Sequence, residues 1–161
     1  MRKTVPQMVV EFRLHWRNYV VQSLLATLVL LLALWVMKAN QMVLVASLGA
    51  TAFIVFALPK SIPARGQNVV GGHAVGLLCG ALCNMLTTSG SPYVIVAYAV
   101  AVGISMFVMV VIDVEHPPAA GTALGIAIEG AGEGVILAVL TGAVLLALAH
   151  HLLRRWLRDL A

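Results

Sequence analysis

The chain has 161 residues, of which 61% are hydrophobic and only 10% are charged, and its formal net charge at pH 7 is +4. Because soluble domains carry about 25% charged residues, this composition excludes a water-soluble fold and indicates an all-α, polytopic membrane helical bundle. The basic residues lie near the ends of apolar segments, where they report topology, and no interleaving of basic and aromatic residues points to nucleic acid. We therefore expect the lipid bilayer as a partner and no nucleic acid.

The N-terminal part of the chain is a basic lead-in to the membrane. Aromatic and apolar side chains recur at helical spacing among four basic residues, which is typical of an interfacial amphipathic helix. Residues 19–37 are then apolar enough, and long enough, to cross a hydrocarbon core about 30 Å thick. We assign residues 1–18 to an interfacial segment, residues 19–153 to the transmembrane domain and residues 154–161 to a basic cytoplasmic tail.

Five more apolar segments follow, and two of them are unusual. The segments are residues 42–58, 69–86, 93–109, 117–128 and 135–153. Residues 47–58 and 117–128 are each only about 18 Å of helix. Both begin with a helix-start signal, because Ser47 is a favourable N-cap and Pro117 and Pro118 suit a first helical turn. Both then read small residue, threonine, alanine (GATA and AGTA). The pattern predicts two inverted three-element repeats, each with a broken or half helix.

Lysine and arginine placement favours six crossings. If all six segments cross with the N-terminus inside, nine of the ten basic residues lie inside and only Lys38 lies outside. If the two short segments are re-entrant, Lys60 and Arg65 move outside and the split falls to seven against three. The positive-inside rule thus favours six crossings with cytoplasmic termini, in a bacterial-type inner (plasma) membrane, and the re-entrant arrangement stays open.

The broken helices suggest an anion site at the midplane, because non-helical backbone at membrane depth is tolerated only beside protein or a water-filled cavity. Inverted symmetry would make the two half-helix N-termini face each other. Each N-terminus carries about half a positive charge and several unpaired N–H groups, so two together would bind an anion. The predicted anion-binding residues are Ser47, Leu48, Gly49, Ala50 and Thr51 on one helix start, and His116, Pro117, Pro118, Ala119, Ala120, Gly121 and Thr122 on the other.

Titratable groups beside the second helix start are further candidates, since ionisable residues within membrane segments are usually functional. His116 could donate to the anion or, when protonated, add a full charge; it could instead bind a carbonyl freed by the prolines. Asp113 and Glu115 could lie in a cytoplasmic vestibule, pair with Lys60 or Arg65, or relay protons. The residues predicted to line or gate the path are Asn68, Gly71, Gly72, His73, Asp113 and Glu115.

Metal binding and helix packing are the other interpretations of these residues. His73, Glu115 and His116 could in principle hold a metal, but no ligand spacing encodes such a site, so we expect no metal and no cofactor. His73 either lines the path or caps a neighbouring loop. Small side chains in membrane helices usually mean close packing. The residues expected to pack in this way are Gly76, Cys79, Gly80, Cys83, Gly103 and Gly142.

Three short motifs resemble the HPP family of integral membrane proteins. HPPAAGTAL at residues 116–124 resembles the family signature, while SLGATA at 47–52 and QNVVGGH at 67–73 resemble its other two motifs, in the same order and with similar spacing. The family is usually described as having four spans, against the six segments counted above. Its chloroplast and cyanobacterial members are nitrite transporters, so the resemblance implies movement of a small monovalent anion, nitrite first. Glu115 departs from the pattern, because relatives often carry a neutral residue there, and this makes proton coupling worth testing.

We therefore expect a transporter of a small inorganic, nitrite-like anion, and not an enzyme. A channel in place of a carrier stays open. The alternative is an intramembrane enzyme that uses Glu115 and His116 in metal-dependent or acid–base chemistry, although no nucleophile–base pair or metal spacing supports it. A third class is a structural or sensory membrane subunit. The small size of the chain suggests a homo-oligomer, a dimer or a trimer.

Overall fold

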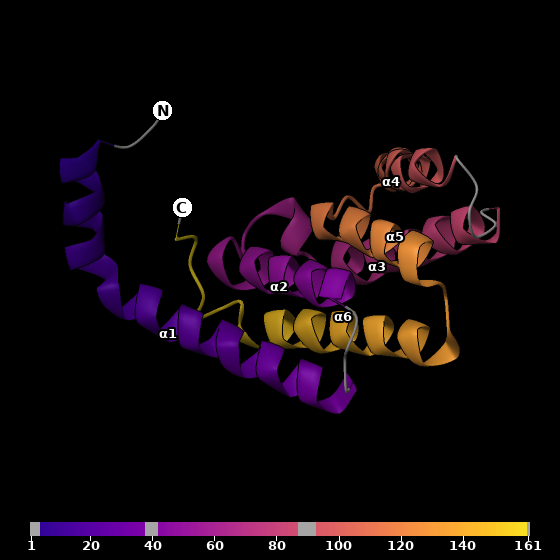
Figure 1. Ribbon diagram of the computed structural model, residues 1–161. Coiled ribbons are helices and arrows are strands. Elements are labelled where there is room, and N and C mark those ends of the chain that lie inside the picture. Colours follow the sequence, from indigo (N-terminus) through magenta and orange to yellow (C-terminus); the bar gives the residue numbers. More distant parts are fainter. Residues whose placement is uncertain (1–3, 38–41, 87–92, 161) are drawn as a thin grey trace.

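The structure is a computed structural model that describes residues 4–37, 42–86 and 93–160. Within these ranges the chain forms helices and no strand (Figure 1). The helices are α1 (Val5–Met37), α2 (Met42–Ala57), the 3-10 turn η1 (Ile62–Ala64), α3 (Gly66–Met85), α4 (Val94–Val111), α5 (Pro117–Glu129) and α6 (Glu133–Leu153). The predicted all-α, polytopic helical bundle is confirmed.

Helix length separates the described helices into two kinds. Four contain stretches that are long and apolar enough to cross a membrane, namely Val5–Trp35, Gly66–Met85, Val94–Val111 and Glu133–Leu153. By contrast, α2 has 16 residues and α5 has 13, which at 1.5 Å per residue is about 24 and 20 Å. These short helices correspond to the two short segments predicted from the sequence.

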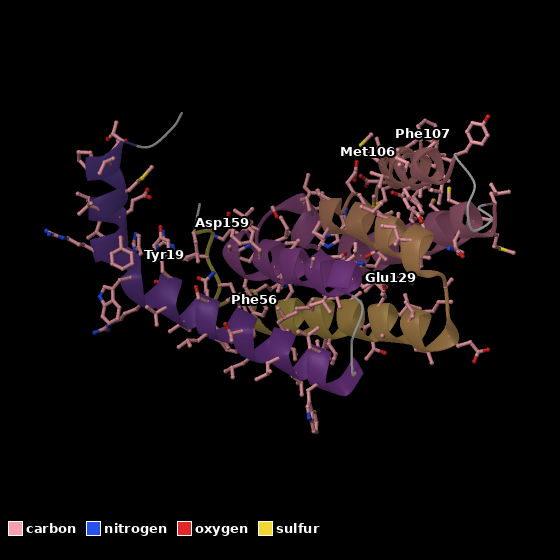
Figure 2. All side chains as sticks on the ribbon, in the orientation of Figure 1. Tyr19, Phe56, Met106, Phe107, Glu129 and Asp159 are labelled. Atoms are coloured by element: carbon pink, nitrogen blue, oxygen red, sulfur yellow. The ribbon has the colours of Figure 1, made fainter. Side chains whose placement is uncertain are left out.

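Large apolar side chains cover the outside of the bundle, as a lipid-facing surface requires. Leu31 on α1 exposes 62% of its surface, and Met106 and Phe107 on α4 expose 59% and 67%. Figure 2 shows Met106 and Phe107 on the outer side of α4, away from the other helices. Several polar side chains, by contrast, are buried inside the bundle.

Two sets of three helices are each in mutual contact, and the contacts between the two sets are as extensive as those within the set α1, α2 and α6. Extensive contacts join α3, α4 and α5 to one another, and likewise α1, α2 and α6 (Figure 1). The groups meet where α2 lies against α5 and where α3 lies against α6. Each group therefore combines two helices from one half of the sequence with the last helix of the other half.

The two short helices lie side by side and antiparallel. Near one end of the contact, a Cβ added at Gly125 would meet Leu44, and further along, one added at Gly121 would meet Ser47. As the chain advances along α5, its partners on α2 therefore come earlier in the sequence. The N-terminus of α5 consequently lies against the middle of α2.

The predicted helix start at Ser47 is wrong, because α2 already begins by Met42 and Ser47 lies inside it. The preceding residues contain neither glycine nor proline. Leu44 is also buried against Ile126 and Val139, and this packing favours continuation of the helix through valines of modest helix propensity. The backbone N–H of Ser47 is consequently in the helix interior, where N–H groups bond to the carbonyl four residues earlier.

Residues 5–37 form one helix, and Figure 1 shows its first turns standing at an angle to the rest, away from the bundle. Phe12 and Trp16 on these turns are exposed. The division into an interfacial segment, residues 1–18, and a membrane domain stays a prediction, and residues 1–3 lie outside the described ranges.

One end of the bundle joins the loop after α2 to the C-terminal segment. The backbone N–H of Lys60 donates to Asp159 Oδ1 at 3.0 Å, and His150 Nε2 donates to the carbonyl of Pro59 at 2.8 Å. Figure 2 shows Asp159 at this end, beside the part of α1 that carries Tyr19. Loop, tail and α1 therefore bring basic side chains to the same end. They are Arg13, Arg17, Lys60, Arg65, Arg154, Arg155 and Arg158.

Candidate functional site

Five buried polar side chains meet between α2, α3 and α5 and form one continuous chain of hydrogen bonds. None of them exposes more than 5% of its surface. They are Ser47 and Thr51 on α2, His73 on α3, and His116 and Thr122 at the start of α5. All five were predicted from the sequence as anion-binding or pathway residues, and we call them together the histidine–hydroxyl chain.

The first half of the histidine–hydroxyl chain centres on His116. This residue precedes Pro117 and has an extended backbone, with φ −139° and ψ 94°, as expected for a residue before proline. Its Nδ1 lies 2.8 Å from the carbonyl oxygen of Pro63. Since a carbonyl only accepts, Nδ1 donates. Its Nε2 lies 2.9 Å from Thr51 Oγ1, so this histidine connects the loop after α2 to α2 itself.

The second half centres on His73. Its Nε2 lies 2.9 Å from Thr51 Oγ1, and its Nδ1 lies 2.8 Å from Thr122 Oγ1. Thr122 Oγ1 is in turn 2.8 Å from Ser47 Oγ, which donates to the carbonyl of Pro118 at 2.6 Å. The histidine–hydroxyl chain therefore runs without a gap between two proline carbonyls and bonds α2 to both α3 and α5.

A stripe of glycines lets α3 approach α5 closely enough to place His73 there. A Cβ added at Gly72 would lie 2.6 Å from Cβ of His116, and one added at Gly76 would overlap the carbonyl oxygen of Ala119. One added at Gly80 would lie 2.5 Å from another α5 carbonyl oxygen. Gly76 and Gly80 thus pack helices as predicted. Gly72, which was predicted to line or gate a path, lies in the same interface.

Asp113 is a helix-terminating residue. It has φ 58°, a left-handed conformation that Asp and Asn tolerate better than most non-glycine residues. Val114 N donates to the carbonyl of Met109 at 2.9 Å, and Asp113 N lies 3.4 Å from the carbonyl of Val110. This is the Schellman arrangement at the C-terminus of α4, with the accompanying contact between Val114 and Met109.

Asn68 carries the one buried side-chain nitrogen or oxygen atom in the described residues that has no hydrogen-bond partner. Its Nδ2 donates to the carbonyl of Glu115 at 3.2 Å, while Oδ1 is buried and unbonded. A buried acceptor without a partner is costly. This oxygen is therefore available to accept a hydrogen bond from a bound water or another bound molecule. The Glu115 side chain is half-buried. In the described residues it forms no ion pair with Lys60 or Arg65, and neither does Asp113.

Several predicted anion-binding residues lie on other faces of the two short helices. Leu48 packs in the core beside Phe56 and Leu146, and a Cβ added at Gly49 would meet no atom within 4 Å. Ala50 and Pro117 are exposed, Ala120 is half-buried, and Ala119 packs against the α3 glycines. Gly121 adjoins Ser47, where an added Cβ would lie 3.5 Å from the serine Cβ. Gly71 lies against Val114.

The predicted socket of two opposed helix N-termini is wrong for two reasons. First, the short helices lie alongside each other, and the start of α2 adjoins Gly125 near the end of α5. The start of α5 is at Pro117, so the two helix N-termini do not face each other. In addition, α5 offers few free donors. Two of its first four residues are prolines, which lack an N–H, and Ala119 N already donates to the carbonyl of His116 at 2.8 Å.

The described residues contain no group of three or more His, Cys, Asp or Glu side chains placed to hold a metal ion. Sequence analysis missed the carbonyl of Pro63, which ends the histidine–hydroxyl chain, and the buried amide of Gln22. Gln22 Nε2 donates to the carbonyls of Phe56 and Arg158, at 2.5 and 2.8 Å, and its Oε1 accepts from Arg158 N at 3.2 Å. A lone amide near the start of the apolar span at residues 19–37 was the available signal.

Gln22 is among the residues that line two cavities. One, of about 300 Å³, is lined by Tyr19, Phe53 and Phe56 among others. The second, of about 160 Å³, includes Arg17 and Trp156 in its lining. No member of the histidine–hydroxyl chain lines either of these cavities, and its five side chains are buried.

Comparisons with known proteins place the chain among transmembrane proteins. A transmembrane protein of Dictyostelium discoideum is 29% identical over 127 residues, which cover 76% of this chain and 45% of that protein. The chain thus spans less than half the length of this curated relative. No solved structure matches the present chain. The family model for the HPP transmembrane region matches residues 11–159, a range that includes all five members of the histidine–hydroxyl chain. The chain belongs to the HPP family of integral membrane proteins.

Proposed function

We propose that the chain transports a small monovalent anion, nitrite first, across a bacterial-type inner membrane, and that the histidine–hydroxyl chain is the site that opens to receive it. The single observation that carries this proposal is a continuous run of buried hydroxyl and imidazole groups between three apolar helices. Polar and ionisable groups are expensive inside membrane proteins and mark transport paths. The resemblance to nitrite-transporting members names nitrite as the first anion to test.

In this proposal side-chain donors, and not helix N–H groups, bind the anion. Separation of α2 from α5 breaks the bonds from Ser47 to Pro118 and from Thr51 to His116. The freed hydroxyl donors would be buried without partners, at a cost of about 1–3 kcal/mol each. Nitrite has oxygen lone pairs that accept from such donors, so it stabilises the open arrangement. In the described conformation the five side chains are buried and bond to one another, as expected of an occluded state.

The two groups of helices provide the moving parts. Each helix of the first half of the sequence has a counterpart in the second half: α1 with α4, α2 with α5 and α3 with α6. When every helix is replaced by its counterpart, each pair of helices in extensive contact becomes another such pair. This supports an inverted repeat. Thr51 and Thr122 occupy the same position in GATA and AGTA, and they bond to opposite nitrogens of His73. Rocking of the group α1–α2–α6 against α3–α4–α5 would expose the site alternately to the two sides.

The charge distribution supports one orientation of the bundle in the membrane. The end formed by the loop after α2, the C-terminal segment and the first part of α1 carries the seven described basic side chains. Glu129 and Glu133 lie on the connection at the other end of α5. By the positive-inside rule, the basic end faces the cytoplasm, with both termini on that side. The large lipid-exposed surface leaves room for assembly into a dimer or trimer.

Nitrite uptake into proteoliposomes tests the proposal, with Thr122→Val as the site variant. The change removes a hydroxyl and keeps the side-chain shape. A lost bond to a charged group costs about 1.5–3 kcal/mol, so we expect uptake to fall at least about tenfold. Thr27→Val is the matched control, because Thr27 is exposed and bonds only to its own helix at Ser23. Equal uptake by the two variants would remove the site from the pathway.

The same assay separates the other classes. Conversion of an added substrate without anion flux would favour an enzyme that uses Glu115 and His116. Wild-type uptake no greater than that of protein-free liposomes, across nitrite, nitrate and formate, would favour a structural or sensory subunit. Saturation of uptake with anion concentration, together with exchange of internal for external nitrite, would favour a carrier over a channel.

A further inference from the structure

We propose that a groove between α1 and the C-terminal end of α6 binds one anionic phospholipid, with the phosphate at the basic end of the bundle and an acyl chain below it. The groove is the cavity of about 160 Å³ that Gln22 lines together with Arg17 and Trp156. The helices α1 and α6 lie side by side along it (Figure 1). Such a site lies outside the transport path and is independent of the solute that the chain transports.

The lining of the groove changes from polar to apolar along α1. Arg17 and Asn18 line its first part, Val21 follows one turn later, and Leu25 lies another turn further on. Because a helix rises 1.5 Å per residue, these positions span about 12 Å along the helix axis. Val21 exposes 52% of its surface, so the groove opens at the outside of the bundle, where lipid lies.

The opposite wall has a tryptophan at the same end. Trp156 lines the groove together with Leu153 and Leu157, and it exposes 60% of its surface. Tryptophan is enriched at the membrane–water interface, because its ring is apolar and its indole N–H takes a polar partner. Leu153 ends α6 and lies further from the C-terminus. Both walls therefore run from headgroup depth into the hydrocarbon region.

Three arginines bring positive charge to the mouth of the groove. Arg17 lines it directly. Arg155 lies over the ring of Trp156, with Cζ 3.9 Å from the ring centroid, and Arg158 Nη1 donates to His15 Nδ1 on α1 at 2.9 Å. None of the eight described residues that line the groove is acidic. Because the guanidinium fork matches phosphate oxygens, the mouth is complementary to a phosphodiester.

Below the arginines the groove offers apolar surface. Gln22 is the buried polar residue of the lining, and its amide is used inside the chain. It donates to the carbonyls of Phe56 and Arg158 and accepts from Arg158 N. The deeper part of the groove therefore suits an acyl chain. A free phosphate ion makes no use of this part, whereas a phospholipid fills it with one chain.

The lipid comes from the leaflet in which the basic end lies. In the orientation proposed above, this is the cytoplasmic leaflet, which is rich in anionic lipids. The span on α1 gains most from such a contact, because only 11% of its membrane-spanning window is buried. A lipid seated between α1 and α6 contacts both helices and fastens α1 to the group α1–α2–α6.

Native mass spectrometry of the whole chain tests the site, with phosphatidylglycerol and phosphatidylcholine of identical acyl chains added to the detergent-solubilised protein. We expect one phosphatidylglycerol to be retained in preference to phosphatidylcholine. Arg17→Gln should lower the affinity for phosphatidylglycerol about fivefold, which is about 1 kcal/mol for one basic residue near an anionic leaflet. Arg13→Gln is the matched control, because it removes the same charge one turn earlier on α1 and Arg13 does not line the groove.

Val21→Trp tests the apolar part, because the larger ring would occupy the place of the acyl chain. It should reduce retention of phosphatidylglycerol to the level of phosphatidylcholine. Leu24→Trp is its control, since Leu24 is equally exposed on α1 but does not line the groove, and it should bind like the wild type. Thermal unfolding of both variants in the same detergent checks that they fold.

Each of three outcomes would overturn the lipid site. They are equal retention of the two lipids, equal loss of phosphatidylglycerol in Arg17→Gln and Arg13→Gln, and displacement of phosphatidylglycerol by the same concentration of glycerol 3-phosphate or inorganic phosphate. The first two would leave only unspecific association, and the third would indicate a free-anion site. None of them bears on nitrite uptake. Retention of phosphatidylglycerol by a wild-type protein that takes up no anion would keep the lipid site and overturn the proposed function.

Discussion

The glycine stripe on α3 allows a sharp test of how the site is built. Gly76 faces the α5 backbone so closely that an added Cβ would overlap the carbonyl oxygen of Ala119. A backbone atom cannot rotate out of the way as a side chain can, so Gly76→Ala must push the two helices apart. Overpacking of this kind costs about 1–3 kcal/mol.

Gly103 and Gly49 are matched controls, because they also lie inside helices and an added Cβ at either position would meet no atom within 4 Å. There alanine should only gain helix propensity, about 0.5–1 kcal/mol. The difference in unfolding free energy between Gly76→Ala and Gly103→Ala is therefore about 1.5–4 kcal/mol. At about 2–4 °C per kcal/mol for a chain of this size, it is a difference of several degrees in Tm.

Thermal unfolding of the purified variants in one detergent measures this difference, and nitrite uptake measures its effect on the site. We expect Gly76→Ala to have the lowest Tm and reduced uptake, because a displaced α3 moves His73 away from the threonines on either side. If Gly76→Ala and Gly103→Ala unfold at the same temperature, then α3 and α5 do not touch through their backbones and the geometry of the histidine–hydroxyl chain is wrong.

Three further predictions concern the parts around the site. Asp113→Gly should raise the unfolding free energy by about 0.5–1 kcal/mol and Asp113→Val lower it by about 1–2 kcal/mol, because φ is 58° there; the opposite order in thermal unfolding would contradict the Schellman assignment. Gln22→Leu should lower stability by roughly 2–5 kcal/mol, since it leaves buried partners on α2 and the C-terminal segment unbonded. Limited proteolysis should then cut the C-terminal segment faster in Gln22→Leu than in Ser23→Leu, a change at the exposed neighbouring residue. Equal rates of cleavage would show that Gln22 does not hold this segment. Cys79 and Cys83, buried among α3, α4 and α5, should resist a water-soluble maleimide with or without nitrite, and labelling during transport would show that this group of helices opens.

How far the sequence predicts the site depends on the range of the interaction. His116 and its two prolines define the start of α5 locally, because proline determines the backbone of the residue before it, and this prediction holds. The role of Ser47 could not be found in this way. Its motif suits a helix start, but the burial of Leu44 against other helices extends α2 past it. The outcome depended on tertiary packing.

The histidine–hydroxyl chain could be predicted from the sequence only in part, for the same reason. The three motifs identify the residue types, yet nothing in the local pattern says that Thr51 lies between two imidazoles or that a carbonyl at Pro63 ends the chain. Those contacts join residues 22 to 65 positions apart. The small residues of α3 were equally ambiguous, since a helix can use glycine for close packing or for ligand access. The structure assigns Gly72, Gly76 and Gly80 to packing.

If transport requires the two helix groups to rock, a bond between them should stop it. Gly66 on α3 and Ala147 on α6 lie on either side of the interface, and a Cβ added at Gly66 would be 3.7 Å from the Ala147 Cβ. This is within the Cβ–Cβ range of a disulfide, about 3.5–4.5 Å. Neither residue belongs to the histidine–hydroxyl chain. Oxidation of the variant Gly66→Cys/Ala147→Cys should therefore abolish nitrite uptake, and a reductant should restore it.

The two single-cysteine variants control for the substitutions themselves and should transport whether oxidised or reduced. Gel mobility under non-reducing conditions reports the fraction that is cross-linked. The two groups contact each other between α3 and α6 and between α2 and α5. A disulfide between α3 and α6 therefore blocks the rotation that would separate α2 from α5. Fully cross-linked protein that takes up nitrite as fast as reduced protein would show that the anion passes without relative motion of the two groups, as in a channel.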